Sequence, residues 1–178
     1  FVQSYINFFG AIVMAGWGCY NKLDQFIMLP VLSMAMAATT FVAQNMGAHN
    51  EKRAIDGTVT SILMSLAITG AIAALLFIFA DTSMRLFTGD EPVIKAGVAF
   101  IHINIFFMLC VDQVLAGALR GRGDSIGPMV IMLLSFVLIR QIYLYLMTRF
   151  ISNTPLTVGF GYPVGWMTCC VLEVLYFY

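Results

Sequence analysis

Five long stretches that are almost free of charge constrain this chain more than any other feature. Residues 25–50 and 57–80 contain no Asp, Glu, Lys or Arg, and residues 96–119, 126–148 and 162–178 contain one each. A helix needs about 20 apolar residues to cross the hydrocarbon core of a bilayer. These stretches therefore predict membrane-spanning helices, the last of them a little short for a full crossing.

The composition supports a lipid environment. Apolar residues make up 61% of the chain and charged residues 10%, against about 45–50% and about 25% in soluble domains. Nine Lys and Arg balance nine Asp and Glu, so no basic surface is available for a nucleic acid. The continuous apolar character favours helices over the alternating strands of a membrane barrel. We expect an all-α, multi-pass membrane protein in contact with the bilayer.

We expect a single transmembrane unit over residues 1–178, in which short polar links separate the helices. The predicted helices cover residues 1–10 (the end of one), 23–47, 54–80, 92–119, 126–148 and 162–178. A short amphipathic helix is expected over 81–87, and the longest loop over 152–163. Both ends of the chain are apolar, so we expect a piece of a longer membrane protein. Lys and Arg are equally frequent at the two sides of the predicted spans, which leaves the orientation open.

Ionisable residues inside the predicted spans are the candidates for function. A charge at the centre of a membrane helix costs about 2.5–3.5 kcal/mol on insertion scales, so it requires a partner, water or a role. Asp112 lies eight residues before Arg120 on a mostly apolar helix face that suits contact with other helices. It is either a proton, cation or cationic-ligand site, or a structural carboxylate that is hydrogen-bonded across helices.

Three further charges have two interpretations each. Arg140, near the middle of its span, is predicted to be a structural charge paired with Asp112 or Glu173 rather than a ligand-binding group. Glu173 is a candidate for binding substrate or a cation, or else a structural acid. Asp24 either forms a solvated pair with Lys22 at the interface or lines a cavity.

Two features concern packing, and several motifs of enzymes are missing. Pro30 lies inside a predicted span, where it removes a backbone hydrogen bond and bends the helix towards a neighbour or a cavity. Gly117 and Gly121 are four residues apart and allow close helix approach. The sequence contains no HExxH, GxSxG or Walker motif, so neither an enzyme nor a cofactor is predicted. The residues themselves indicate no metal site.

Two stretches resemble the signatures of the multidrug and toxic compound extrusion (MATE) transporters. The first is FVAQNMGA at residues 41–48, followed by Arg53-Ala54, and the second is GALRGRGD at residues 117–124, followed by Pro128-Met129. Departures from the family pattern are Ala43 in place of Gly, Ser125 in place of Thr, and Ile142 in place of Pro. The residues that match the motifs are Gln44, Asn45, Gly47, Ala48, Arg53, Arg120, Gly121, Gly123 and Asp124.

The resemblance implies a fold and a function. It places the chain over helices seven to twelve, the C-terminal lobe of a twelve-helix transporter whose other lobe would be its partner. Such a protein exports cationic or amphipathic drugs in exchange for Na⁺ or H⁺ by alternating access, here in a bacterial inner membrane. The resemblance also implies that Lys52, Arg53, Arg120 and Arg122 face the cytoplasm.

The resemblance leaves the coupling ion and some alternatives open. The family's acid on helix ten falls near Leu109, three residues before Asp112, so Asp112 is a displaced substitute or has another role. A related flippase for a lipid-linked saccharide is an alternative, for which Arg140 would be the only mid-span cation. A membrane enzyme is a weaker alternative, and a helical scaffold without transport is the remaining one.

Overall fold

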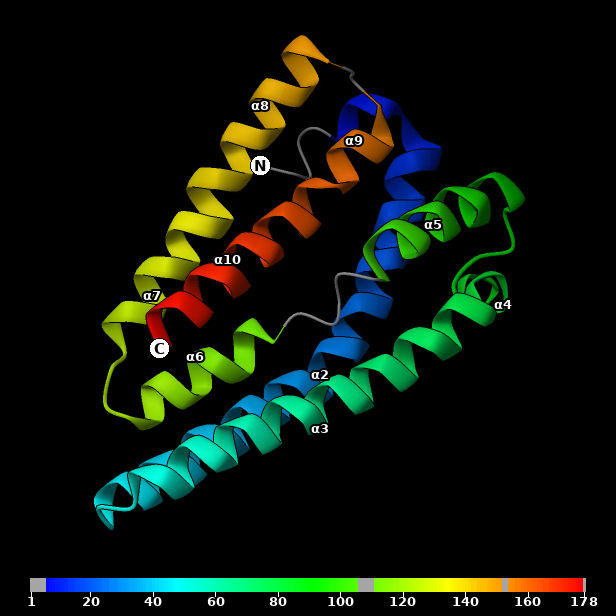
Figure 1. Cartoon of the computed structure of the whole chain (residues 1–178). Helices are drawn as coiled ribbons and strands as arrows, with labels where there is room; N and C mark the ends of the chain where they lie inside the picture. The colour runs from blue at the N-terminus through cyan, green and yellow to red at the C-terminus, as the bar shows by residue number, and fades with distance from the viewer. Residues whose placement is uncertain (1–5, 106–110, 152–153, 178) are drawn as a thin grey trace.

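The computed structural model describes residues 6–105, 111–151 and 154–177 and confirms the all-α prediction (Figure 1). Helices account for nearly all of these residues, and no strand occurs among them. The elements are η1 (Asn7–Phe9), α2 (Ala11–Gly47), α3 (Glu51–Ile78), α4 (Ala80–Arg85), α5 (Glu91–Asn104), α6 (Asp112–Gly121), α7 (Ile126–Leu133), η3 (Leu134–Ile139), α8 (Arg140–Phe150), α9 (Pro155–Gly159) and α10 (Gly161–Phe177).

Helix α2 is longer than predicted. It runs for 37 residues from Ala11, twelve residues before the expected start, and passes through Pro30 without ending. The polar residues around position 22 suggested a helix boundary, but Trp17 and Tyr20 on the same helix are buried and hold this region in the bundle. Of the helix end predicted over residues 1–10, the structure describes a single 3₁₀ turn at Asn7–Phe9; residues 1–5 lie outside the description.

Four helical segments within the described residues are long and apolar enough to cross a membrane: Ala11–Gly47, Glu51–Ile78, Ile126–Phe150 and Pro155–Phe177. The third comprises α7, η3 and α8, which follow one another without a break. The span predicted over 92–119 is instead described as two helices, because α5 ends at Asn104 and α6 begins at Asp112. Residues 106–110 between them are outside the description. The chain is thus a multi-pass integral membrane protein.

Two of the predicted connections are short helices. α4 begins one residue before the stretch 81–87 that was expected to form a short amphipathic helix and overlaps most of it. The loop predicted over 152–163 was wrong, because α9 and the first turn of α10 occupy most of its described part. The glycines and prolines suggested a loop, but Pro155 is well placed in the first turn of a helix. The Thr154 side chain caps that turn by accepting a hydrogen bond from the Thr157 N–H.

The helices pack around α2, which lies along α3, α5 and α6 (Figure 1). At one end the indole of Trp17 meets the rings of Phe100 and Tyr162, with centroid separations of 4.9 and 5.3 Å. Further along α2, the Thr39 hydroxyl lies within hydrogen-bond distance of the backbone oxygens of Ala35 and Gly117. Helix α10 packs against α6 on one side and against the α7–η3–α8 rod on the other.

Gly117 and Gly121 confirm the predicted close helix approach. A Cβ atom at Gly117 would lie 2.5 Å from the carbonyl oxygen of Ala35, and one at Gly121 would lie 2.6 Å from that of Thr39. Glycine therefore lets the backbones of α6 and α2 touch at two successive turns. This contact fixes the position of α6, whose first residue is Asp112.

Candidate functional site

Two buried carboxyl groups lie on helices that pack against each other. Asp112 is 3% exposed at the start of α6, and Glu173 is fully buried on α10. The two helices pack together, and the two carboxyl groups interact electrostatically. The structure therefore places two of the three predicted substrate or cation candidates on neighbouring helices.

The surroundings of Glu173 offer its carboxyl group few hydrogen-bond partners. Neither carboxylate oxygen has a hydrogen bond of good geometry with any described residue, and the same is true of the buried Ser135 hydroxyl on η3. The thiol of Cys169, one turn before Glu173, lies beside both side chains. Asp112 is better satisfied, because its Oδ2 atom accepts a hydrogen bond from the amide of Gln113 at 3.2 Å. Ser135 and Cys169 were not identified as site residues from the sequence.

The segment that carries Ser135 has an unusual geometry. Residues Leu134–Ile139 form a π-helix between α7 and α8. Short π-helical stretches inside α-helices occur frequently at functional sites. Here the segment packs directly against α10, the helix of Glu173.

The third acid, Asp24, occupies a separate place in the bundle. Its side chain is largely buried on α2, its Oδ1 atom has no hydrogen-bond partner among the described residues, and it interacts electrostatically with Tyr162 of α10. The solvated pair with Lys22 does not form in the structure. The Lys22 ammonium instead lies 5.9 Å from the centre of the Phe87 ring.

The predicted pairing of Arg140 with a carboxylate was wrong. No ion pair joins it to Asp112 or Glu173 in the described structure; its guanidinium lies between the rings of Phe136 and Tyr162, 4.9 and 4.4 Å from their centroids. The aromatic faces attract the cation and take the place of a carboxylate. The Nε atom of Arg140 is buried without a hydrogen-bond partner among the described side chains.

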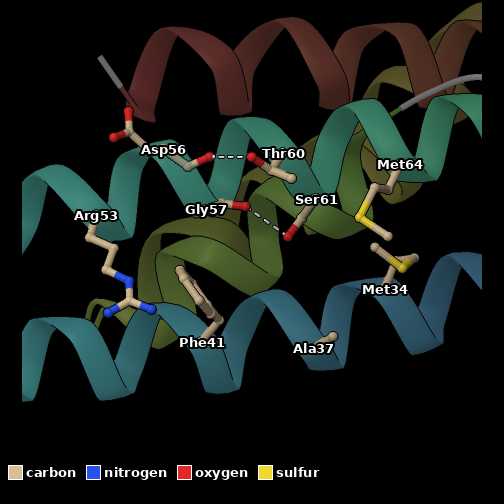
Figure 2. A pocket seen from close by; sticks show the side chains of 9 residues that line it. All are labelled: Met34, Ala37, Phe41, Arg53, Asp56, Gly57, Thr60, Ser61 and Met64. Carbon is tan, nitrogen blue, oxygen red and sulfur yellow. Dashed lines mark hydrogen bonds between the residues drawn. The ribbon is translucent and has the colours of Figure 1, made fainter.

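An open groove of about 500 Å³ lies between α2 and α3 (Figure 2). Arg53 places its guanidinium 5.8 Å from the centre of the Phe41 ring. The hydroxyls of Thr60 and Ser61 donate to backbone oxygens of their own helix, so they present little polar surface to the groove. The lining residues are Met34, Ala37, Phe41, Arg53, Asp56, Gly57, Thr60, Ser61 and Met64.

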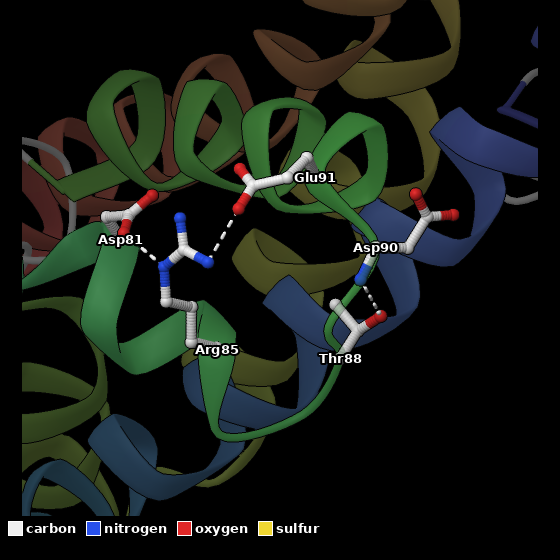
Figure 3. A network of polar contacts seen from close by, with 5 residues as sticks. All are labelled: Asp81, Arg85, Thr88, Asp90 and Glu91. Atoms are coloured by element: carbon white, nitrogen blue, oxygen red, sulfur yellow. Dashed lines mark hydrogen bonds and ion pairs between the residues drawn. The ribbon is translucent and has the colours of Figure 1, made fainter.

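A polar network connects α4 to α5 outside the apolar segments (Figure 3). The Arg85 guanidinium pairs with Asp81 at 2.7 Å and with Glu91 at 2.6 Å. These hydrogen bonds raise the pKa of Arg85 above its ordinary value. Because the network is exposed, it contributes mainly to the orientation of this connection.

The first motif forms the end of α2 and the turn to α3. Gln44 is exposed, whereas the buried Asn45 donates a hydrogen bond to the Phe41 carbonyl. Gly47 ends α2, and Ala48 follows as its C-terminal cap. Asn50 then caps α3 by accepting a hydrogen bond from the backbone N–H of Arg53.

The second motif forms the turn from α6 to α7. Arg120 is exposed, and Gly123 has a φ of 93°, a conformation that favours glycine. Asp124 accepts hydrogen bonds from the Gly127 N–H at 2.9 Å and from the Tyr176 hydroxyl at 2.7 Å. These hydrogen bonds lower the pKa of Asp124, and the one from Tyr176 has the larger effect. The motif residues thus shape two turns, and the buried acids lie elsewhere.

Comparison with known proteins identifies the family. The MatE family model matches residues 1–146. The chain belongs to the MatE family. Among curated MatE relatives, it is 26% identical over 170 residues to "Probable multidrug resistance protein YpnP" of Bacillus subtilis, covering 94% of this chain and 38% of that protein. It is 34% identical over 155 residues to "Probable multidrug resistance protein NorM" of Oceanobacillus iheyensis, and the match covers 86% of this chain and 34% of that protein.

Solved MatE structures share the fold. "Crystal structure of MATE in the bent conformation" superposes with a TM-score of 0.91 at 15% identity, covering 98% of this chain and 39% of that one. The structure titled "Inward-facing conformation of a multidrug resistance MATE family transporter of the MOP superfamily" also gives a TM-score of 0.91 at 15% identity. That match covers 98% of this chain and 40% of the other. The chain therefore spans about two fifths of the length of the relatives it matches.

Proposed function

We propose that this chain is the C-terminal lobe of a secondary active transporter that exports cationic or amphipathic drugs in exchange for Na⁺ or H⁺. Its partner is an N-terminal lobe of the same protein, and its location is a bacterial inner membrane. The activity is transport and not catalysis. The observation that carries the proposal is the burial of the carboxyl groups of Asp112 and Glu173 inside a MatE fold.

Buried acids suit this function because their charge state can change with the bound ligand. A carboxylate in a low-dielectric site attracts a proton or a cation. If an ion and a cationic drug favour different arrangements of the two lobes, binding of one releases the other. The acids then convert an ion gradient into drug export by alternating access.

The flippase alternative receives less support. A pyrophosphate-linked substrate requires cations that are free to contact it. Arg140, the mid-span cation considered for that role, is instead engaged by the Phe136 and Tyr162 rings.

Replacement of Asp112 tests the proposal. In proteoliposomes that contain the full-length protein, we expect Asp112→Asn to reduce drug efflux by about tenfold, a typical size for a coupling free energy between two sites. Efflux is measured under separate Na⁺ and proton gradients. The exposed Asp90, whose side chain does not cap α5, provides a matched Asp90→Asn control that should retain wild-type efflux. Unchanged efflux and ion dependence in Asp112→Asn would remove this residue from the mechanism.

A further inference from the structure

A second groove, of about 350 Å³, lies where α6 turns into α7. One face of the α7–η3 segment forms most of it, because the apolar lining residues lie in two rows of every fourth residue along the helix. The outer row is exposed, with Met129 at 52%, Leu133 at 54% and Val137 at 53%. The apolar lining residues are Pro128, Met129, Met132, Leu133, Phe136 and Val137.

The polar end of this groove has an unpaired cation. Among the described residues that line it, the one charged side chain is Arg120, at the end of α6, and the one hydroxyl is that of Ser125. Arg120 is exposed, and no described residue holds its guanidinium in an ion pair or a hydrogen bond. Ser125 precedes α7 without capping it through its side chain. Arg122, by contrast, donates a hydrogen bond to the Phe177 carbonyl oxygen at 3.4 Å.

The charges at this end favour an anion. No Asp or Glu of the described ranges lines the groove. Asp124, the acid of the same turn, accepts hydrogen bonds from the Gly127 N–H and the Tyr176 hydroxyl. Because α7, η3 and α8 follow one another as a single rod from Ile126, the positive end of its helix dipole also lies here. An anionic group on Arg120 would therefore meet no acidic side chain of the groove.

The length of the groove corresponds to one leaflet of a bilayer. Ser125 and Val137 are twelve positions apart, which is about 18 Å along a helix that rises about 1.5 Å per residue. One leaflet of a hydrocarbon core about 30 Å thick measures about 15 Å. The rod, Ile126–Phe150, is long and apolar enough to cross a membrane, so the groove runs from its first turn towards the bilayer centre. A ligand with a charged head and a long apolar tail fits this arrangement.

We propose that this groove binds an anionic phospholipid, with the phosphate on Arg120 and Ser125 and one acyl chain along the exposed face of α7 and η3. Arginine binds phosphate through charge-assisted hydrogen bonds, and basic pockets between membrane helices bind anionic lipid headgroups. Phosphatidylethanolamine carries the same phosphate, but its ammonium group finds no acid among the lining residues. Phosphatidylglycerol, which has hydroxyls in place of the ammonium, is therefore the better match.

Photolabelling of the full-length protein tests this site. The protein is reconstituted in phosphatidylcholine vesicles with a small fraction of phosphatidylglycerol or phosphatidylethanolamine, each with the same photoreactive acyl chain. The labelled peptides are then identified by mass spectrometry. We expect phosphatidylglycerol to label residues 128–137 about fivefold more than phosphatidylethanolamine, which corresponds to about 1 kcal/mol for one basic residue near an anionic lipid.

Substitutions of arginine locate the source of the preference. Arg120→Ala should abolish it, so that the two lipids label residues 128–137 equally, whereas Arg120→Lys should keep most of it because the charge remains. Arg149→Ala is the matched control, since Arg149 is exposed at the opposite end of the same rod and does not line this groove. This control should keep the wild-type preference.

Three results would overturn the proposal. Equal labelling by the two lipids in the wild type would show unselective contact with the bilayer. No label at residues 128–137 would show that the N-terminal lobe or a second copy of the chain covers the groove. A preference that Arg120→Ala leaves unchanged would show that another group attracts the lipid. Because the wild type alone provides the first two comparisons, the test does not depend on the folding of a variant, and drug efflux plays no part in it.

Discussion

Gly117 sets the distance between α6 and α2. Replacement by Ala places a Cβ atom 2.5 Å from the Ala35 carbonyl oxygen, so that the two backbones must move apart. We expect Gly117→Ala to destabilise the protein by about 1–3 kcal/mol, the usual range for overpacking. The thermal unfolding temperature of the full-length protein in detergent measures this loss.

Gly18 on α2 provides the matched control. A Cβ atom at this position would meet no atom within 4 Å, so Gly18→Ala adds a methyl group without a clash. Alanine also has the higher helix propensity, by up to about 1 kcal/mol. The control should therefore unfold at the wild-type temperature or above. Equal unfolding temperatures for Gly117→Ala and the wild type would contradict the close contact between α6 and α2.

At the scale of elements, the turn between α6 and α7 is tied to the end of α10. The Tyr176 hydroxyl donates to Asp124, and the Arg122 guanidinium lies 4.1 Å from the centre of the Phe177 ring. Both contacts join residues more than fifty positions apart in sequence. The sequence motif at residues 117–124 therefore contributes to the docking of α10, the helix of Glu173.

This contact should make stability depend on pH. Because the pKa of Asp124 is lowered in the folded protein, its stabilising effect is present above the ordinary value of about 4 and is lost as the pH falls through the lowered pKa. Tyr176→Phe removes the larger cause of the shift. We expect this variant to unfold at a lower temperature than the wild type at neutral pH, and the difference to disappear in strong acid.

Tyr145→Phe is the control for this measurement. Tyr145 is exposed on α8 and far from the turn in sequence, so its replacement should leave the pH dependence of unfolding unchanged. A constant difference between Tyr176→Phe and the wild type at every pH would show that Asp124 is not the titrating group.

The sequence predicted elements better than it predicted partners. Long uncharged stretches located most helices, because lipid exposure leaves a signal along the chain. The sequence could not show that α2 begins at Ala11, since burial of Trp17 and Tyr20 depends on Phe100 and Tyr162 from distant helices. For the same reason Arg140 was assigned a carboxylate partner, whereas two aromatic rings surround it. The π-helical geometry at Ser135 left no signal in the sequence.

The sequence identified candidate acids but not how they are arranged in the fold. Asp112 and Glu173 stood out because a charge in an apolar span is rare, and each could be identified without a fold. The sequence could not predict that these two acids lie on neighbouring helices. They are 61 positions apart in the sequence, and only the packing of α6 on α10 brings their helices together. For Asp24 the sequence left open a pair with Lys22 or a place in a cavity, and the helix directs these two side chains to different neighbours.

At the scale of the whole molecule, many large apolar side chains are exposed on the outer surface. Leu63 lies inside an apolar segment of α3 and is 62% exposed. If this surface contacts lipid, Leu63→Arg places a charge in hydrocarbon at a cost of about 2.5–3.5 kcal/mol on insertion scales. We expect a marked decrease in the amount of folded full-length protein recovered from the membrane.

The same substitution outside the apolar segments separates this effect from a general intolerance of arginine. Leu86 is 79% exposed and follows α4, beyond the apolar span of α3. Leu86→Arg should be recovered in wild-type amounts, because its side chain can remain in water or among lipid headgroups. Fluorescence-detected size-exclusion chromatography of detergent extracts compares both variants with the wild type. Equal recovery of Leu63→Arg would indicate that this face of α3 contacts water and not lipid.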